Sequence, residues 1–300
     1  MAKSRDWIIG LIIAGSFMVF TALTVMVFLG LSASDGVEFG GFGKRIAIVD
    51  VEGAISSSAE VVRQLRRFSE DESIPAIVLR VDSPGGGVAP SQEIYSELLR
   101  VREKGKTVVV SMGSVAASGG LYIAVAADRI VANPGTLTGS IGVIFQFPTA
   151  EKLFEKIGVR YETVKSGTYK DIGNLSRTMT EPEAAALQTV IDDTYDQFIE
   201  AVAQGRELDK DSVRLFADGR IFTGRQALEM RLVDDLGDLQ DALNIAAEMV
   251  GMEAPPKTVH AVERKRASFL DLFGSMLFQW LTGVARDEGL AAPYLQYRFQ

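Results

Sequence analysis

The sequence contains no cysteine and a single histidine, His260. The missing cysteines exclude disulfide bonds, thiolate metal sites and a cysteine nucleophile, and they leave the redox compartment undetermined. A serine–histidine–aspartate mechanism would have to use His260, and a histidine-rich metal centre is excluded. We therefore expect neither a metal ion nor another cofactor.

Acidic residues outnumber basic ones, 39 Asp and Glu against 31 Lys and Arg, so the formal net charge is −8 at pH 7. Duplex binding needs clustered positive charge to displace counterions from phosphates, so we expect no nucleic-acid partner. The 300 residues are 47% hydrophobic, which is enough for one large core or two modest ones, and nothing in the composition indicates disorder.

An uncharged apolar stretch occupies residues 7–31. As a helix it would be roughly 37 Å long, which exceeds a hydrocarbon core of about 30 Å. We expect a cytoplasmic N-terminus and a transmembrane signal anchor within residues 1–34; a cleaved signal peptide is the alternative, but its apolar region is usually shorter. Lys3 and Arg5 precede the span, so the positive-inside rule predicts a single-pass protein of the cytoplasmic (inner) membrane with its large domain on the extracytoplasmic side.

Three further regions follow the predicted anchor. Residues 35–43 are glycine-rich and predict a tether. Between 44 and 250, apolar runs alternate with amphipathic patterns, which predicts one α/β domain with parallel strands and helices on both faces. The tail, 251–300, contains an apolar stretch at 268–284, either a packing or oligomer-contact helix or an interfacial amphipathic helix. Within the domain we expect strands at 45–55, 76–81, 107–112, 128–132, 141–147 and 159–165, and helices at 57–71, 91–103, from 118, at 151–158, 181–207 and twice within 222–251.

The segment DSPGGG, residues 82–87, follows a predicted strand. Consecutive glycines allow backbone N–H groups to converge on an oxyanion or a phosphate, although a Pro-Gly pair after a strand is also typical of an ordinary turn. The segment lacks the lysine of a phosphate-binding loop, so we do not predict a nucleotide site.

Ser118, in VAASGGLY, is the candidate nucleophile. A serine on a sharp strand-to-helix turn needs small residues two positions before and after it, and Ala116 and Gly120 meet this requirement. Amides at the helix start would stabilise an oxyanion. On local sequence alone, a serine that only caps the helix fits equally well. Ser111 and Ser114 do not have small residues at both of these positions.

A nucleophilic serine needs a base, and His260 comes after the domain is complete. Lysine can serve where an apolar site favours its uncharged form. The segment KSGTYKDIGN offers Lys165 and Lys170, but a lysine is usually a solvated surface charge, and spacing does not choose between the two roles.

Five motifs occur in the order DSPGGG, VAASGGLYIA, TGSIGV, KSGTYKDIG and GRIFTGRQALEMRLVDDLG. Together they resemble the bacterial signal peptide peptidase (SppA) family of serine peptidases, whose distant relatives are the Clp protease and the crotonases. The resemblance covers residues 45–250 and implies a Clp protease/crotonase-like core.

The resemblance also implies roles for individual side chains. Ser118 would be the nucleophile and Lys170 the general base of a Ser-Lys dyad. Ser140 would orient the lysine, and Lys165 would have no catalytic role.

By analogy with the Clp protease, Gly85 and Gly119 would donate the oxyanion-hole hydrogen bonds, with Gly86 as a substitute for Gly85. Two departures from the family pattern, Leu121 and Arg231, remove no catalytic group.

The implied function is a membrane-anchored serine endopeptidase that degrades residual signal peptides and other hydrophobic peptides. The resemblance implies a homo-oligomer, most similar to the octameric kind. Misfolded envelope proteins are equally compatible substrates. A crotonase-like acyl-CoA enzyme and a non-catalytic membrane scaffold are the alternatives; the anchor and the lack of a well-placed carboxylate pair weigh against the first.

Overall fold

The computed structural model describes residues 15–21 and 43–260. Residues 15–21 are helical and belong to the predicted membrane span, whereas the rest of that span, nearly all of the tether and the tail from 261 on lie outside the described residues. In the part that is described, none of the helices combines the length and apolarity needed to cross a bilayer.

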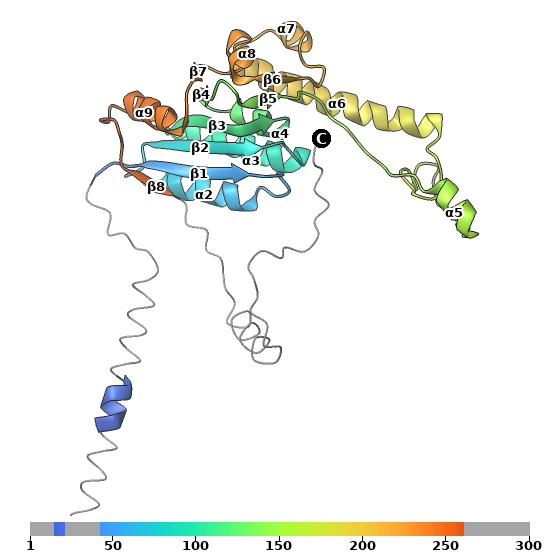
Figure 1. Ribbon diagram of the computed structural model, residues 1–300, viewed down its shortest axis with the longest axis horizontal. Helices are drawn as coiled ribbons and strands as arrows, with labels where there is room; N and C mark the ends of the chain where they lie inside the picture. Colours follow the sequence, from blue (N-terminus) through green and yellow to red (C-terminus); the bar gives the residue numbers. More distant parts are fainter. Residues whose placement is uncertain (1–14, 22–42, 261–300) are drawn as a thin grey trace, which may run out of the picture. The chain divides into compact units, whose positions relative to one another are not determined.

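Eight strands form one sheet within the described residues (Figure 1). In chain order they are β1 (Ile46–Glu52), β2 (Ala76–Ser83), β3 (Thr107–Ala117), β4 (Arg129–Ala132), β5 (Leu137–Gly139), β6 (Ile221–Thr223), β7 (Asp235–Leu236) and β8 (Thr258–His260). The order across the sheet is β6-β5-β3-β2-β1-β8, and β4 pairs with both β3 and β7. Five pairs are parallel: β1–β2, β2–β3, β3–β4, β3–β5 and β4–β7. The pair β5–β6 is antiparallel.

Helices cover both faces of this sheet (Figure 1). They are α2 (Ala59–Glu70), α3 (Val88–Glu103), α4 (Gly119–Ala124), α5 (Glu151–Ile157), α6 (Glu181–Arg206), α7 (Lys210–Arg214), α8 (Gly224–Glu229) and α9 (Leu239–Met249). On one face α9 packs against Ile46, Val78 and Val109. On the other face α3 lies between α2 and α4 and contacts both, and all three helices contact the sheet. The predicted α/β core with a mostly parallel sheet is therefore confirmed.

The central strands are buried along their whole apolar runs, because both sheet faces are covered. Ile46, Ala47, Ile48 and Val49 of β1 are at most 2% exposed. Alternate side chains point to opposite faces, so consecutive apolar residues serve two layers of helices. For this reason the predicted strands at 45–55, 76–81, 107–112 and 128–132 are all found.

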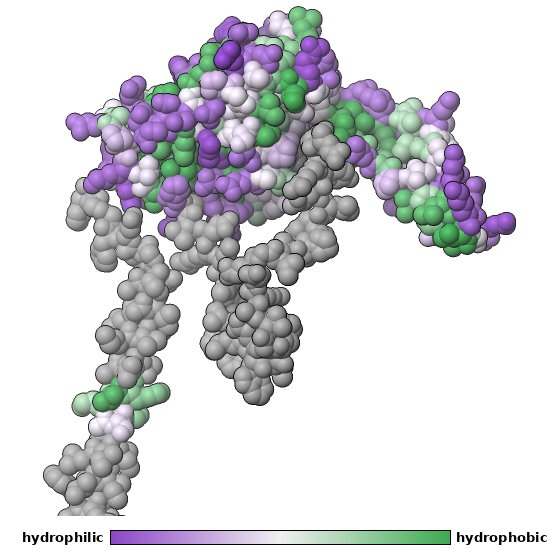
Figure 2. Space-filling view, viewed as in Figure 1, coloured by the Kyte–Doolittle hydropathy of each residue, from purple (hydrophilic) through white to green (hydrophobic). Residues whose placement is uncertain are grey.

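Two predicted strands are wrong, those at 141–147 and 159–165. Both belong to an excursion between β5 and α6, and no strand lies beside either of them among the described residues. We call residues 145–180 the arm. The arm contains α5 and lies at the N-terminal end of α6 (Figure 1). Apolar side chains stay on its surface, as Figure 2 shows; they include Phe145, Leu153, Ile157, Tyr161 and Val164.

Candidate active site

Ser118 stands on a sharp turn between β3 and α4. Its φ is 52° and its ψ is −118°, a backbone conformation that a non-glycine residue adopts only where the surrounding structure imposes it. Although Ser118 occupies the N-cap position, its side chain makes no capping hydrogen bond. The helix-cap alternative is therefore unsupported, and the half-buried hydroxyl has no hydrogen-bond partner among the described residues.

The small residues around Ser118 are required by close packing against β2 and α3. A Cβ on Gly120 would lie 2.9 Å from the carbonyl oxygen of Ser83, and one on Gly119 would lie 2.6 Å from Ser91 Oγ. Ala116 is fully buried beside Ser83 in the β2–β3 register. Larger side chains would push the turn out of place.

The two rival serines have other environments. Ser111 is buried and accepts a hydrogen bond from Nη1 of Arg80 at 2.8 Å. Ser114 is exposed on the surface. Of the three serines in β3 or directly after it, Ser118 is thus the one that has a free hydroxyl and stands at the start of a helix.

Ser140 is brought beside Ser118 by strand pairing. Ala117 pairs with Gly139 in the parallel β3–β5 ladder, and the amide of Ser118 donates to the carbonyl of Gly139 at 2.9 Å. Ser140 also has a φ of 52°, and its amide donates to the carbonyl of Arg220 at 2.8 Å. Two of the predicted site serines are therefore adjacent along the ends of neighbouring strands.

The glycine segment after β2 lies directly against Ser118. Gly85 has a φ of +101°, and a Cβ there would be 2.7 Å from the amide nitrogen of Gly119. The Gly85 amide already donates to Ser83 Oγ at 3.1 Å. The amides of Gly86 and Gly119, by contrast, have no acceptor among the described residues, and a Cβ built on Gly119 would lie 3.3 Å from the Gly86 nitrogen. Of the three predicted glycines, Gly86 and Gly119 are therefore the two whose amides are free to donate to a bound oxygen.

A cavity of about 120 Å³ opens beside the serine. Its walls include Ser118, Gly86 and Gly119, together with Val143, Tyr122 and Phe198. The rings of Tyr122 and Phe198 meet edge to face, with centroids 5.1 Å apart. Burial raises the pKa of the Tyr122 phenol. The cavity suits one small or medium apolar side chain.

Lys170 does not lie in this cavity. It is exposed on the arm, and no ion pair or side-chain hydrogen bond engages its ammonium in the described structure. Within the described part of the chain, the arm's helix α5 makes no extensive contact with another helix or strand. The structure therefore brings together Ser118, Ser140 and the glycines within one chain, but it leaves Lys170 apart from them.

Lys165 and His260 have other positions. Lys165 donates to Asp171 Oδ1 at 2.5 Å and to the carbonyl of Thr168 at 2.9 Å. His260 ends β8, and β1 and β2 separate that strand from β3. Among the described residues, no group of three or more His, Cys, Asp or Glu side chains could hold a metal ion.

Sequence reasoning missed part of the cavity wall. Val143 belongs to the segment wrongly predicted as a strand, and Phe198 comes from α6 far along the chain. In the sequence both segments are apolar, which indicates that their side chains are buried but does not indicate that they line this cavity.

Comparison with known proteins identifies the family. The sequence model of peptidase family S49 matches residues 100–253, and that of the Clp protease matches residues 42–135. The chain belongs to peptidase family S49. The predicted resemblance is confirmed, and the match to peptidases favours peptide hydrolysis over the acyl-CoA and scaffold alternatives.

Three relatives show the extent of the similarity. A putative protease of Synechocystis is 47% identical over 221 residues, which cover 73% of this chain and 79% of the relative. A putative signal peptide peptidase SppA of Enterococcus faecium is 36% identical over 69% of this chain and 64% of its own length. Protease 4 of Haemophilus influenzae is 37% identical over 72% of this chain, but this match spans only 36% of that longer protein.

Proposed function

We propose that this S49 serine protease is a membrane-anchored endopeptidase in which Ser118 is the nucleophile and Lys170 the general base. One observation carries the proposal: Ser118 presents an unengaged hydroxyl on a strained turn, next to the free amides of Gly86 and Gly119 and beside a partly apolar cavity. This is the geometry that acyl transfer to a serine requires.

In the first half of the reaction, the uncharged amine of Lys170 takes the proton from Ser118 Oγ as that oxygen attacks the peptide carbonyl carbon. The carbonyl oxygen becomes negatively charged and is bound by the amides of Gly86 and Gly119. The Lys170 ammonium then gives its proton to the leaving amine when the C–N bond breaks. Water hydrolyses the acyl-enzyme, and Ser140 helps to orient the lysine.

The position of the arm supports a homo-oligomer. Because Lys170 is remote from Ser118 in its own chain, the dyad forms when the arm of a second copy supplies the lysine. Exposed apolar side chains on the arm, such as Leu153, Ile157 and Val164, are suited to burial in such a contact. An assembly of eight subunits is the arrangement that we propose.

The substrates that we propose are hydrophobic peptides, notably signal peptides left in the membrane after preprotein processing. The cavity beside Ser118 accepts one apolar side chain, and an extended peptide could pair with a strand edge nearby. An anchor within residues 7–31, with the domain on the extracytoplasmic side, would place the site where such peptides are released.

Cleavage of a Leu/Ala-rich peptide by the full-length chain in detergent tests the dyad. Ser118→Ala and Lys170→Ala should each lower kcat by roughly a thousandfold or more, whereas Ser114→Ala, an exposed serine on the same strand, should not. Mixing the two inactive variants should restore activity, since one copy then supplies the serine and the other the lysine. Full activity in either single variant would remove the dyad from consideration.

A further inference from the structure

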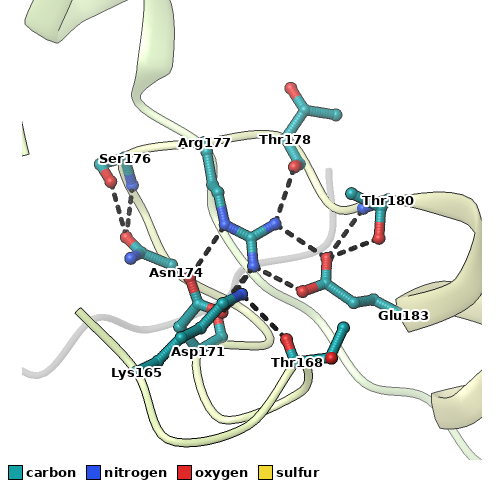
Figure 3. Close-up of polar contacts among 9 residues, drawn as sticks. All are labelled: Lys165, Thr168, Asp171, Asn174, Ser176, Arg177, Thr178, Thr180 and Glu183. Atoms are coloured by element: carbon teal, nitrogen blue, oxygen red, sulfur yellow. Dashed lines mark hydrogen bonds and ion pairs between the residues drawn. The ribbon is translucent and has the colours of Figure 1, made fainter. Parts of the chain in front are cut away.

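Four charged side chains form a connected cluster on the arm, which we call the Arg177 cluster: Lys165, Asp171, Arg177 and Glu183 (Figure 3). Glu183 is in the first turn of α6, and the other three come from the arm. The Asp171 side chain is 12% exposed and that of Glu183 is 3% exposed. The two carboxylates are therefore shielded, whereas Lys165 and Arg177, at 32% and 28%, stay partly exposed to solvent.

Arg177 joins two separate segments of the chain. Its Nε donates to Asp171 Oδ2 at 3.0 Å, and its two terminal nitrogens donate to the Glu183 carboxylate at 2.8 and 2.5 Å. The same terminal nitrogens reach the carbonyls of Thr178 and Asp171, each at 3.3 Å. All three nitrogens of the planar guanidinium donate hydrogen bonds, so Arg177 fixes both the spacing and the orientation of the arm relative to the start of α6.

Lys165 closes the loop that contains Lys170. Through Asp171 Oδ1 and the carbonyl of Thr168, its ammonium ties the first residue of the segment 165–171 to the last. Inside this loop the amide of Lys170 donates to the carbonyl of Gly167 at 3.2 Å. The backbone that presents Lys170 is thus held from both ends.

The cluster also decides what Lys170 can bind. Asp171 is its immediate neighbour and would be a natural partner for its ammonium. Two cations, Lys165 and Arg177, already pair with that carboxylate and offset its charge, which weakens its attraction for a third, and Lys170 makes no ion pair among the described residues.

We propose that Arg177 is a positioning residue for the peptidase site. Arg177 holds the Lys170 loop at the start of α6 and keeps Asp171 from forming an ion pair with Lys170. The inference rests on the proposed role of Lys170 as the base. Arg177 itself touches neither substrate nor the reacting atoms. Loss of Arg177 would misplace the base, and a misplacement of about 1 Å can cost about a hundredfold in rate.

Steady-state cleavage by the full-length protein gives the first test. Arg177→Met should lower kcat at least tenfold and leave KM within about twofold, because the cavity beside Ser118 is untouched. Arg177→Lys, which keeps the charge but lacks the planar fork, should also lose kcat. The matched control is Arg214→Met. Arg214, in α7, makes an exposed ion pair with Asp196 of α6, the helix that also contains Glu183. Wild-type kcat in Arg177→Met would overturn the inference.

A nitroxide label gives a test that does not depend on catalysis. The sequence has no cysteine, so Lys170→Cys provides a unique attachment point. The spectrum of the label should show restricted motion with Arg177 present and faster motion in Lys170→Cys/Arg177→Met. Lys165→Met removes only the contacts of Lys165 with Asp171 and Thr168, so it should increase the motion of the label less. This variant replaces Arg177→Met in the experiment if Arg177→Met folds poorly. Identical spectra with and without Arg177 would overturn the inference.

The two proposals fail in different ways. If Lys170→Ala retains full activity, the proposed dyad is wrong, whatever the Arg177 variants do. If Lys170→Ala is inactive but Arg177→Met keeps both its kcat and the restricted label, only the positioning role is wrong.

Discussion

The amide of Ser118 donates a hydrogen bond to the carbonyl of Gly139, 2.9 Å away, and this bond couples Ser118 to the end of β5. Since Ser140 follows Gly139 directly, the turn at the end of β3 and the turn at the end of β5 are set by the same contact. Both serines have a φ of 52°, so each turn depends on the other for support.

Gly139→Ala should disrupt this coupling. Gly139 has a φ of +84°, and a Cβ there would lie 2.6 Å from the Phe222 ring and 2.9 Å from the carbonyl oxygen of Arg220. We expect kcat on a hydrophobic peptide to fall at least tenfold, as expected when a catalytic group is displaced. Gly105→Ala is the control, because Gly105 has a φ of +82° but open space around it. Equal activity of the two variants would contradict the prediction.

Enlarging the cavity should change substrate preference. Phe198 is 5% exposed and forms one wall, so Phe198→Leu should favour peptides with a bulkier side chain at the cleavage site by roughly tenfold in relative kcat/KM. Phe198→Ala should extend the trend at a cost of about 3 kcal/mol in the free energy of unfolding. Product mapping by mass spectrometry measures the preference, and an unchanged cleavage pattern in both variants would show that another surface selects the side chain.

Glu183 should contribute to stability only above the acid range. Hydrogen bonds from Arg177 lower the pKa of Glu183 from 4.5 to about 2. A carboxyl whose pKa is lowered by folding stabilises the folded state above its unfolded pKa, and this contribution is lost as the pH falls from 4.5 to about 2. The difference in thermal stability between the wild type and Glu183→Gln should therefore shrink over that interval.

Asp218→Asn provides the comparison for Glu183. The ion pair with Arg220 lowers the pKa of Asp218 to about 2 as well, but both side chains are about half exposed. Solvent screening weakens such a pair, so this substitution should change stability less at every pH. A larger effect for Asp218→Asn than for Glu183→Gln would contradict the argument from burial.

Gly205→Ala should displace α6 from α4. A Cβ on Gly205 would lie 2.0 Å from the carbonyl oxygen of Val125, which is backbone and cannot rotate away. We expect a loss of roughly 1–3 kcal/mol in denaturant unfolding. Gly135→Ala, where nothing lies within 4 Å, should be neutral within error. If the two variants unfold at the same denaturant concentration, the contact between α6 and α4 is looser than described.

The core was predictable because its signal is local. The apolar runs of β1, β2 and β3 are covered on both faces, so each run indicates a buried strand without knowledge of its neighbours. Ser118 was predictable for a similar reason, since the small residues that its turn requires are adjacent in the chain.

The arm was not predictable in the same way. Residues 141–147 and 159–165 have the apolar or alternating pattern of strands, but they lie where no described strand pairs with them. A pattern reports that side chains are apolar and does not report what covers them. The short strands β5 to β8 depend on partners far along the chain, and the placement of Lys170 likewise depends on the arm as a whole.

The distance of Lys170 from its own Ser118 has a consequence for regulation. In the dyad that we propose, nucleophile and base come from different copies, so a newly made chain would be latent and dilution alone would inactivate it. Specific activity would then rise with protein concentration and level off once assembly is complete. Such a protease would spare the proteins around it until enough copies had assembled.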